Sequence, residues 1–192
     1  MESHFYAMMS RLKFIDRWAL MRNSTPENLS EHSLEVAMLA HALAVIGNRY
    51  LGKDLDAKQA ALIGMYHDAT EIITGDMPTP IKYFNKDIRD AFKAIEDNAA
   101  YKLVRMLPEE MQDEFRDIFE PVGCEYEKKL VKAADKLSAL IKCIEESKAG
   151  NREFVQAEKA TEQALQEMKL PEVEIFMERF FPSYYKTLDE LQ

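Results

Sequence analysis

A cluster of ionisable residues interrupts an apolar stretch in the first half of the chain. His67 and Asp68 are adjacent, Glu71 follows one turn later, and Asp76 comes just after Gly75. On a helix, Glu71 would lie on the same surface as His67 and Asp68, because residues three or four apart are neighbours. A buried helix rarely carries three such groups unless they pair or hold a metal ion. The alternative is an ordinary polar helix edge, with His67 a hydrogen-bonded core histidine.

A second candidate ligand is His32, which lies between two serines in the first turn of a predicted helix. The helix dipole disfavours added positive charge there, so the imidazole stays neutral more easily, and this suits a metal ligand. A capping or packing role for His32 is the alternative. His4 is terminal and His41 has no ionisable neighbours, so neither is a candidate.

The third candidate, Asp135, is not favoured by helical periodicity. It falls about 140° from the centre of the apolar stripe of its helix, at about 100° per residue. The pattern alone therefore predicts a solvated aspartate near Lys128, Lys132 and Lys136. Asp135 becomes interesting only in combination with His32 and the His67–Asp68 pair.

These residues, in this order, resemble the HD-domain metal-dependent phosphohydrolases. The similarity is closer to the bacterial 5'-deoxynucleotidases called YfbR-like proteins, and it extends over essentially the whole chain. The His–Asp pair is a nonspecific motif. The Arg17–Trp18 pair and the loop from Gly75 to Pro80 are much more specific, and both are present here.

The resemblance implies a cofactor, one divalent transition metal ion held by His32, His67, Asp68 and Asp135. Two imidazoles and two carboxylates form a mixed nitrogen and oxygen set. Such a set suits Co²⁺, Mn²⁺, Fe²⁺, Ni²⁺ or Zn²⁺ and is too rich in nitrogen for Ca²⁺. Co²⁺ is the ion we expect to support activity in vitro. Asp68 and Asp135 would also face the substrate.

The resemblance further implies roles for Arg17 and Trp18. A guanidinium presents parallel donors to phosphate oxygens and keeps its charge, so Arg17 would orient the phosphate. Trp18 would lie against the sugar and disfavour a ribose 2'-hydroxyl. The alternatives are a surface arginine at a helix end and a core tryptophan that closes the first helix.

The loop after Gly75 would form another wall of the substrate site. Asp76 would accept a hydrogen bond from a sugar hydroxyl such as the 3'-OH, and Met77, Pro78 and Thr79 would shape the same wall. A proline-stiffened loop loses less entropy when it binds a ligand.

The implied function is that of a 5'-deoxynucleotidase, which hydrolyses deoxyribonucleoside 5'-monophosphates to deoxynucleoside and phosphate. Glu71 is the candidate general acid or base, because a desolvated carboxylate has a raised pKa. Its alternative role is to orient His67. The alternative functions are those of an HD-domain phosphodiesterase acting on a cyclic or dinucleotide substrate and of a non-enzymatic helical adaptor.

Helical periodicity and capping residues predict the elements that position these groups. The expected helices cover residues 4–18, 29–47, 57–75, 86–107, 109–119, 125–149 and a seventh that begins after residue 151. Asn28, Asp56, Asn85 and Asn151 are the expected caps. Phe180, Phe181, Tyr184 and Tyr185 near the end of the chain suggest either a core or a patch for self-association.

Length and composition favour an all-α fold that forms a single domain over residues 1–192, and the resemblance implies an HD-domain helical bundle. The chain has 6 Gly and 7 Pro, which argues against a sandwich or barrel. A net charge of −9 argues against nucleic acid as a partner. Two unclustered cysteines and the absence of a signal pattern or membrane-spanning run predict a cytoplasmic protein. The resemblance implies that the partner is a small-molecule deoxynucleotide. The resemblance points to a homodimer.

Overall fold

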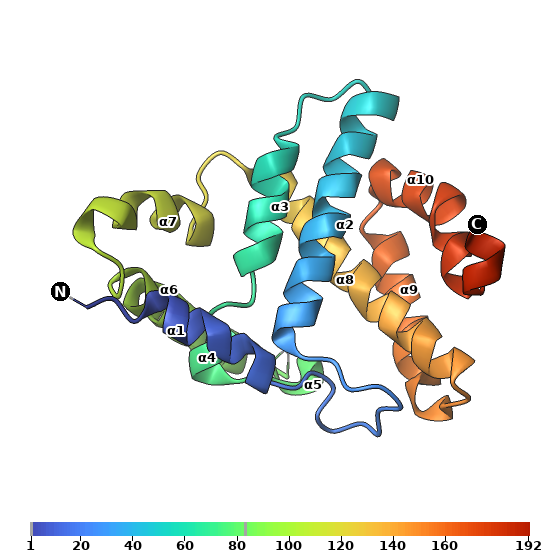
Figure 1. Cartoon of the computed structure of the whole chain (residues 1–192), viewed down its shortest axis with the longest axis horizontal. Helices are drawn as coiled ribbons and strands as arrows, with labels where there is room; N and C mark the ends of the chain where they lie inside the picture. The colour runs from blue at the N-terminus through green and yellow to red at the C-terminus, as the bar shows by residue number, and fades with distance from the viewer. Residues whose placement is uncertain (1, 83) are drawn as a thin grey trace. The chain divides into compact units, whose positions relative to one another are not determined.

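The computed structural model describes residues 2–82 and 84–192, and for residues 79 and 80 it describes only the backbone. No strand occurs in these described ranges, so the predicted all-α class is confirmed (Figure 1). The α-helices are α1 Phe5–Met9, α2 Leu29–Tyr50, α3 Ala57–Tyr66, α4 Glu71–Thr74, α5 Thr79–Lys82, α6 Lys86–Val104, α7 Gln112–Phe119, α8 Glu125–Lys148, α9 Val155–Glu167 and α10 Pro171–Arg179. Short 3₁₀ helices are η1 Ser10–Phe14, η2 Glu109–Met111, η3 Arg152–Phe154, η4 Phe181–Tyr185 and η5 Leu188–Leu191.

The four predicted caps are confirmed. Asn28 accepts hydrogen bonds from the backbone N–H groups of Ser30 and Glu31, and the Glu31 carboxylate reaches back to the Asn28 N–H at 3.3 Å. This reciprocal arrangement is a capping box, and it fixes the first turn of α2. The other three caps accept from the backbone N–H groups of Gln59, Ile88 and Glu153.

The predicted first helix, residues 4–18, is shorter than expected. It consists of α1 followed by η1 and ends at Phe14, after which Ile15 is extended. The chain turns away from the helix because Asp16 forms an isolated antiparallel bridge with Asn28. Apolar spacing could not reveal this pairing, since the partner segment lies beyond a loop.

The predicted third helix is also wrong in its second half. It breaks at Tyr66, and residues 67–70 form tight turns before α4 begins at Glu71. Here the backbone bonds run from residue i+3 to residue i, as in Ala69 N–H to Tyr66 O and Glu71 N–H to Asp68 O. His67 and Glu71 therefore do not share one α-helical surface, and a tighter winding presents the ionisable side chains.

The chain divides into two compact units, each of which is described by itself. The first contains residues 1–22, 26–33 and 66–123, and the second contains residues 23–25, 34–65 and 124–192. Two of the boundaries fall inside α2 and at the last residue of α3, and the others lie in loops. A single domain over residues 1–192 stays a prediction.

The first unit has a core built around aromatic rings. Phe5 of α1 is fully buried and meets Phe115 of α7 edge to face, with ring centroids 4.9 Å apart. Tyr66 joins the same rings, at 5.9 Å from Phe115. Leu103, Val104 and Leu107, from α6 and just after it, complete the cluster. Tyr66 directly precedes His67, so this packing anchors the backbone that carries the candidate ligands.

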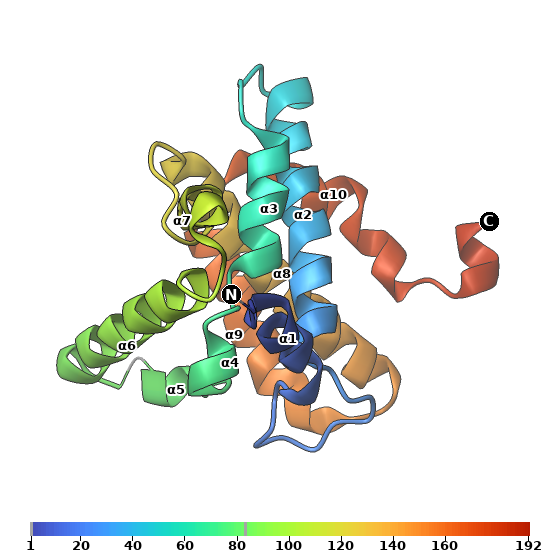
Figure 2. The ribbon, with the colours of Figure 1, turned by 60° about the vertical axis from the view of Figure 1, so that its left-hand side comes forward.

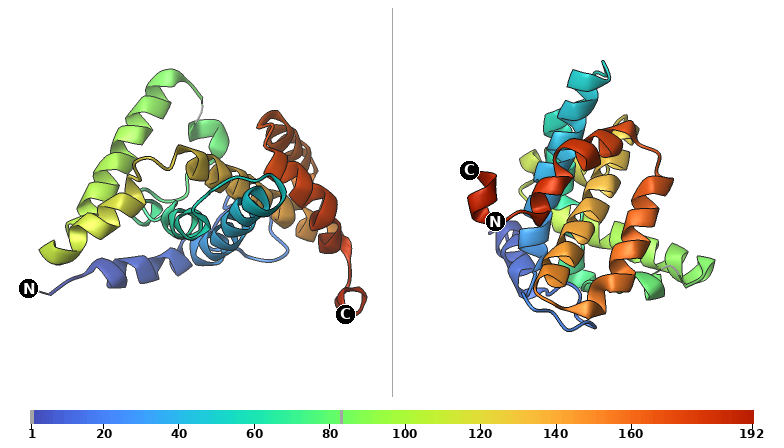
Figure 3. Two further views of the ribbon diagram at one scale, coloured as in Figure 1. Left: turned by 90° about the horizontal axis from the view of Figure 1, so that it is seen from above. Right: turned by 90° about the vertical axis from the view of Figure 1, so that its right-hand side faces the viewer.

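The second unit has the larger apolar core, formed by α2, α3, α8, α9, α10 and η4. Helices α2 and α3 lie side by side, as Figure 2 shows. A Cβ at Gly64 would lie only 3.0 Å from the Cα of Ala37, so the missing side chain permits this close approach. Helices α8 and α9 also pack against each other (Figure 3).

Helix α2 corrects one sequence expectation. It is long and apolar enough to cross a membrane by length and composition alone, although no such run was expected. More than half of its most apolar window is buried inside the molecule, which is also what the core helix of a folded domain shows.

The C-terminal aromatic residues differ in burial, and a role in self-association stays a prediction. Phe181 is buried in the second core, whereas Phe180 and Tyr185 are exposed.

A buried ion pair anchors a loop within the second unit. Glu146 of α8 is 1% exposed and accepts hydrogen bonds from Lys142, from Asn151 at 2.7 Å and from the backbone N–H of Ser24 at 2.8 Å. Lys142 also donates to the carbonyl of Thr25. Burial by itself would raise the pKa of Glu146, but these donors overcome it and hold that pKa well below its ordinary value.

We predict that Glu146→Gln lowers the free energy of unfolding by about 3 kcal/mol, because it leaves the buried Lys142 ammonium without its counter-charge. Urea unfolding measures this change. The loss of unfolding free energy in Glu146→Gln is largest at neutral pH, for the following reason. A lowered pKa contributes stability above the pKa of the unfolded glutamate, and that contribution disappears as the pH falls through the folded value.

The matched control is Glu125→Gln on the same helix, where an exposed glutamate pairs with Lys128 at 2.9 Å. This variant should unfold like the wild type, because exposed ion pairs contribute little. Equal stability of Glu146→Gln and the wild type would show that the buried pair is dispensable.

Candidate active site

Two segments separated by a loop are joined by backbone hydrogen bonds in the first unit. The N–H of Arg17 donates to the carbonyl of Glu27 at 2.9 Å, and the N–H of Leu29 donates to the carbonyl of Ile15 at 3.0 Å. The pairing places Arg17 and Trp18 beside Glu27, one turn before His32 in α2. The local fold thus brings an arginine, a tryptophan and a histidine together from a part of the chain with no predicted strand.

His32, His67 and Asp68 converge, as predicted for metal ligands. The Nε2 atom of His67 lies 3.0 Å from Oδ2 of Asp68, and Nε2 of His32 lies 3.5 Å from the same oxygen. The two imidazole rings have centroids 5.2 Å apart. His32 is buried and the other two side chains are largely covered. Three atoms of the types that bind transition metals therefore point to one place.

These separations fit three ligands of a single ion. Two atoms that each bind a metal at about 2.1 Å lie about 3.0 Å apart at a right angle and about 3.4 Å apart at a tetrahedral angle. The observed values of 3.0 and 3.5 Å match this range. Imidazole nitrogens combined with a carboxylate oxygen also form the donor set that Co²⁺, Fe²⁺ and Zn²⁺ accept.

Asp68 is the carboxylate that both histidines share. Burial would raise the pKa of Asp68, but the two adjacent imidazoles outweigh burial and hold that pKa well below its ordinary value. The side chain is therefore ionised at neutral pH, which is the state a metal ligand requires.

Glu71 lies at the start of α4 and has the opposite electrostatic character. It is 6% exposed, and its Oε2 atom accepts no hydrogen bond from the described residues. Burial and the neighbouring carboxylates Asp68 and Asp76 raise the pKa of Glu71 to about 9, although Lys82 and Arg17 oppose this shift. A carboxyl group in these surroundings holds its proton at neutral pH and can donate it.

Asp76 follows Gly75 at the end of α4 and meets Trp18. Its carboxylate accepts a hydrogen bond from the backbone N–H of Trp18. Burial raises the pKa of Asp76, Arg17 opposes that rise, and Asp68 adds to it. The predicted sugar-binding aspartate and the predicted sugar-facing tryptophan are thus neighbours.

Glu27 is a site residue that the sequence did not reveal. Its Oε1 accepts from Nη1 of Arg17 at 2.9 Å, and its Oε2 accepts from Nε1 of Trp18 at 2.9 Å. Oε1 also lies 3.7 Å from Nδ1 of His32. A glutamate in a polar loop carries no periodic signal. The only available hint was its place next to the Asn28 cap.

The other predicted residues are less closely defined. Met77 and Pro78 are half-buried in the loop between α4 and α5, and the Pro78 carbonyl accepts from the N–H of Ile81 at 2.8 Å. The side chain of Thr79 lies outside the described part of the structure. Asp135 is half-buried in α8 of the second unit, and its role as a ligand stays a prediction.

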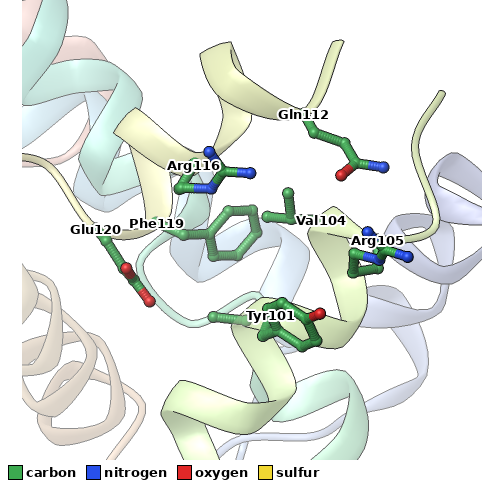
Figure 4. A pocket seen from close by; sticks show the side chains of 8 residues that line it. Tyr101, Val104, Arg105, Gln112, Arg116, Phe119 and Glu120 are labelled. Carbon is green, nitrogen blue, oxygen red and sulfur yellow. The ribbon is translucent and has the colours of Figure 1, made fainter. Parts of the chain in front are cut away.

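A hollow between α6 and α7 is separate from this cluster (Figure 4). Its lining includes Tyr101, Arg105, Arg116 and Phe119 but none of the predicted site residues. Arg116 pairs with Asp113 at 2.7 Å on the exposed surface. We therefore centre the candidate active site on His32, His67 and Asp68.

The sequence of this chain is similar to proteins whose names state an activity. The family described as 5'-deoxynucleotidase YfbR-like matches residues 4–184. The 5'-deoxynucleotidase YfbR of Escherichia coli O1:K1 is 53% identical over 191 residues, which cover 99% of this chain and 96% of that protein. The chain belongs to the YfbR-like family. The predicted family and the predicted class of enzyme, a 5'-deoxynucleotidase, are both confirmed.

Solved structures confirm the fold of this YfbR-like chain. An HD-domain phosphohydrolase from Listeria innocua has a TM-score of 0.80 at 21% identity, covering 94% of this chain and 88% of that one. An HD phosphohydrolase of cyanophage S-2L, solved with dA and one catalytic Zn²⁺ ion, has a TM-score of 0.51 at 23% identity, covering 71% and 69%. The predicted HD-domain helical bundle is therefore correct.

We predict that Glu71→Gln raises the melting temperature of the metal-free protein at pH 8. The folded pKa of Glu71, about 9, lies above the unfolded value. The folded state therefore keeps a proton that the unfolded chain releases, and stability falls as the pH rises above about 4.5. Glutamine does not titrate, so the variant escapes this loss.

Thermal melts with EDTA at pH 5 and pH 8 measure the difference. We expect Glu71→Gln to melt about 5 °C higher at pH 8, with a much smaller gap at pH 5. Glu31→Gln, an exposed change in the same unit, should follow the wild type at both values. A difference in melting temperature that was larger at pH 5 than at pH 8 would contradict the raised pKa of Glu71.

Proposed function

We propose that this YfbR-like protein hydrolyses deoxyribonucleoside 5'-monophosphates to deoxynucleoside and phosphate, using one divalent transition metal ion. The observation that carries the proposal is the convergence of His32, His67 and Asp68, with Arg17 and Trp18 held nearby through Glu27. The S-2L phage enzyme, which binds dA and a catalytic Zn²⁺, supports the same chemistry for this fold.

Four residues would hold the ion: His32, His67, Asp68 and, from α8, Asp135. When bound, the ion supplies Lewis acidity, which activates a water molecule and draws electron density from a phosphate oxygen. The two carboxylates offset its two positive charges. Co²⁺ is the ion we expect to give most activity in vitro, with Mn²⁺, Fe²⁺, Ni²⁺ and Zn²⁺ as alternatives.

Arg17 would bind the phosphate of the substrate. Its guanidinium has five N–H donors, and the bond to Glu27 occupies one of its terminal nitrogens. The positive charge of Arg17 offsets the charge that spreads over the phosphoryl oxygens during transfer. Arg17 is close enough to lower the pKa values of Glu71 and Asp76, which places it electrostatically inside the cluster.

Trp18 and Asp76 would recognise the sugar. The Asp76 carboxylate, which already contacts the Trp18 backbone, would accept a hydrogen bond from the 3'-OH. The Trp18 ring would occupy the space that a ribose 2'-OH needs, and Met77, Pro78 and Thr79 would shape the adjoining wall. The sugar class would therefore be selected by exclusion at one carbon and by hydrogen bonding at the next.

Glu71 would move the proton. A buried carboxyl group with a pKa raised to about 9 can protonate the leaving 5'-oxygen at neutral pH. A bound cation would lower that pKa toward neutrality, where proton transfer in both directions is most efficient. The broken helix supports this role over a purely orienting one, because Glu71 is not on one α-helical surface with His67.

The enzyme would act in the cytoplasm, in nucleotide metabolism, as a homodimer. Cys124 and Cys143 are far apart in the sequence and form no disulfide-type cluster, which is typical of a reducing compartment. Large apolar side chains are exposed on the second unit, including Leu34 and Met38 on α2 and Tyr185 near the C-terminus. Such exposed groups favour self-association.

We predict that the purified protein releases phosphate from dAMP faster than from AMP once Co²⁺ or Mn²⁺ is present, and that EDTA abolishes the activity. His67→Ala and Asp135→Asn should each lower the rate at least about 100-fold and lower the bound metal measured by mass spectrometry, since each removes a ligand. A colorimetric phosphate assay gives the rates.

His41→Ala is the matched control, because His41 is exposed on α2 and is not one of the predicted ligands. It should keep both metal and activity. Full activity in His67→Ala would end the metal proposal. Turnover of a cyclic nucleotide by a protein inactive on all monophosphates would instead favour the phosphodiesterase function.

We predict a dimer in solution at micromolar concentration. Multi-angle light scattering should give about twice the 22.2 kDa mass of one chain. Charged substitution of Met38, an exposed apolar residue on α2, tests the apolar surface directly. A monomeric wild-type protein at this concentration would refute the homodimer.

A further inference from the structure

Glu27 binds both Arg17 and Trp18, the two residues proposed to recognise the phosphate and the sugar of the substrate. One carboxylate oxygen binds the guanidinium of Arg17 and the other binds the indole N–H of Trp18, both at 2.9 Å. The Glu27 side chain is only 12% exposed. Hydrogen bonds with a charged partner are stronger than neutral ones, and two bonds from one carboxylate fix orientation as well as distance.

The backbone of Trp18 needs such support. Its φ angle is +59°, in the left-handed region that a bulky residue rarely adopts. This conformation costs about 1–2 kcal/mol. Asp76 accepts from the Trp18 N–H and Glu27 accepts from its indole, so the residue is held at the backbone and at the ring. A strained residue that its neighbours hold in place is a common feature of functional sites.

The ring and the guanidinium also face each other. The Cζ of Arg17 lies 5.7 Å from the centroid of the Trp18 ring, within the range of a cation–π contact. Both groups therefore form one unit with the Glu27 carboxylate. A shift of that carboxylate would displace both.

We propose that Glu27 is a positioning residue that sets the selectivity of the enzyme for deoxyribose. It fixes the Trp18 ring where a ribose 2'-OH would lie, and it fixes Arg17 where the phosphate binds. This inference rests on the proposed function, and it assigns the control of sugar selectivity to a residue that does not itself touch the sugar.

Three substitutions at Glu27 distinguish the effect of the carboxylate's geometry from the effect of its charge. Both partners are donors, so Glu27→Gln would replace one of two acceptors by an amide NH₂ and lose one bond. Glu27→Asp keeps the charge but shortens the side chain by one methylene, so it no longer reaches both partners. Glu27→Ala removes both bonds. Each variant weakens the hold on the Trp18 indole and leaves the contact of Asp76 with the Trp18 backbone in place.

The first test does not depend on activity. Trp18 is the only tryptophan in the chain, so intrinsic fluorescence reports its surroundings alone. In the metal-free protein, Glu27→Gln and Glu27→Ala should shift the emission to longer wavelength and increase quenching by acrylamide. Glu31→Gln is the control, because glutamine also serves in a capping box and the side chain is exposed. It should leave the spectrum unchanged.

The second test is the ratio of kcat/KM for dAMP to that for AMP at saturating Co²⁺. We expect the ratio to fall roughly tenfold or more in Glu27→Ala, the range for loss of a charged hydrogen bond. The fall should come mainly from a gain on AMP, because the displaced Trp18 ring no longer excludes the 2'-OH. The displacement of Arg17 should lower kcat/KM for both substrates alike, since both carry the same phosphate. Glu27→Asp should lie between Glu27→Ala and the wild type.

The outcomes distinguish this inference from the proposed function. If the wild type hydrolyses dAMP but Glu27→Ala changes neither the fluorescence nor the dAMP/AMP ratio, the proposed role of Glu27 is wrong and the proposed function still stands. A wild type inactive on every monophosphate would overturn the proposed function, while the fluorescence would still test the contact. If Glu27→Ala failed to fold by circular dichroism, the Gln and Asp variants would decide.

Discussion

The candidate site is organised by the repulsion among its carboxylates. Asp68 and Asp76 raise the pKa of Glu71, Asp68 also raises that of Asp76, and all three side chains are at least half-buried in the first unit. Three buried negative charges cannot coexist without compensation. The structure resolves this in two ways: histidines surround Asp68 and keep it ionised, whereas Glu71 is left to hold a proton. One carboxylate therefore suits a metal and its neighbour suits acid catalysis, although both are acidic residues three positions apart.

The difference between Asp68 and Glu71 depends on two points where the backbone departs from regular structure. The helix that ends at Tyr66 continues as tight turns, so His67 and Glu71 do not lie on one α-helical surface. The bridge between Asp16 and Asn28 brings a segment from before the loop against the start of α2. Both irregular segments are flanked by well-packed elements, since Tyr66 lies in the aromatic core and Asn28 caps a long helix. Rigid neighbours are what allow an irregular backbone to hold a precise site.

The sequence predicted the helices better than it predicted these two departures. Caps such as Asn85 and Asn151 act through local hydrogen bonds, so their residue types were sufficient. The break after Tyr66 was missed because Ile72 and Ile73 continue the apolar pattern across it, and periodicity records burial rather than winding. Glu27 was missed because its partners are set by a pairing between distant segments. The identities of His32, His67 and Asp68 came from spacing and resemblance, but their separations required the structure.

The pairing of Arg17 with Glu27 has a consequence for how an acidic protein with a net charge of −9 attracts a phosphate. The guanidinium alone does not make the site positive, because its charge is offset by the carboxylate that holds it. In the proposed function, Arg17 would supply oriented donors, and the net charge of the cluster would depend on the histidines, the carboxylates and the cation they would bind. Phosphate affinity and metal binding would then be linked, since an ion bound by the carboxylates would cancel the negative field that would otherwise repel the substrate. Selectivity for the sugar, which we assign to the strained Trp18, would be separable from that charge balance.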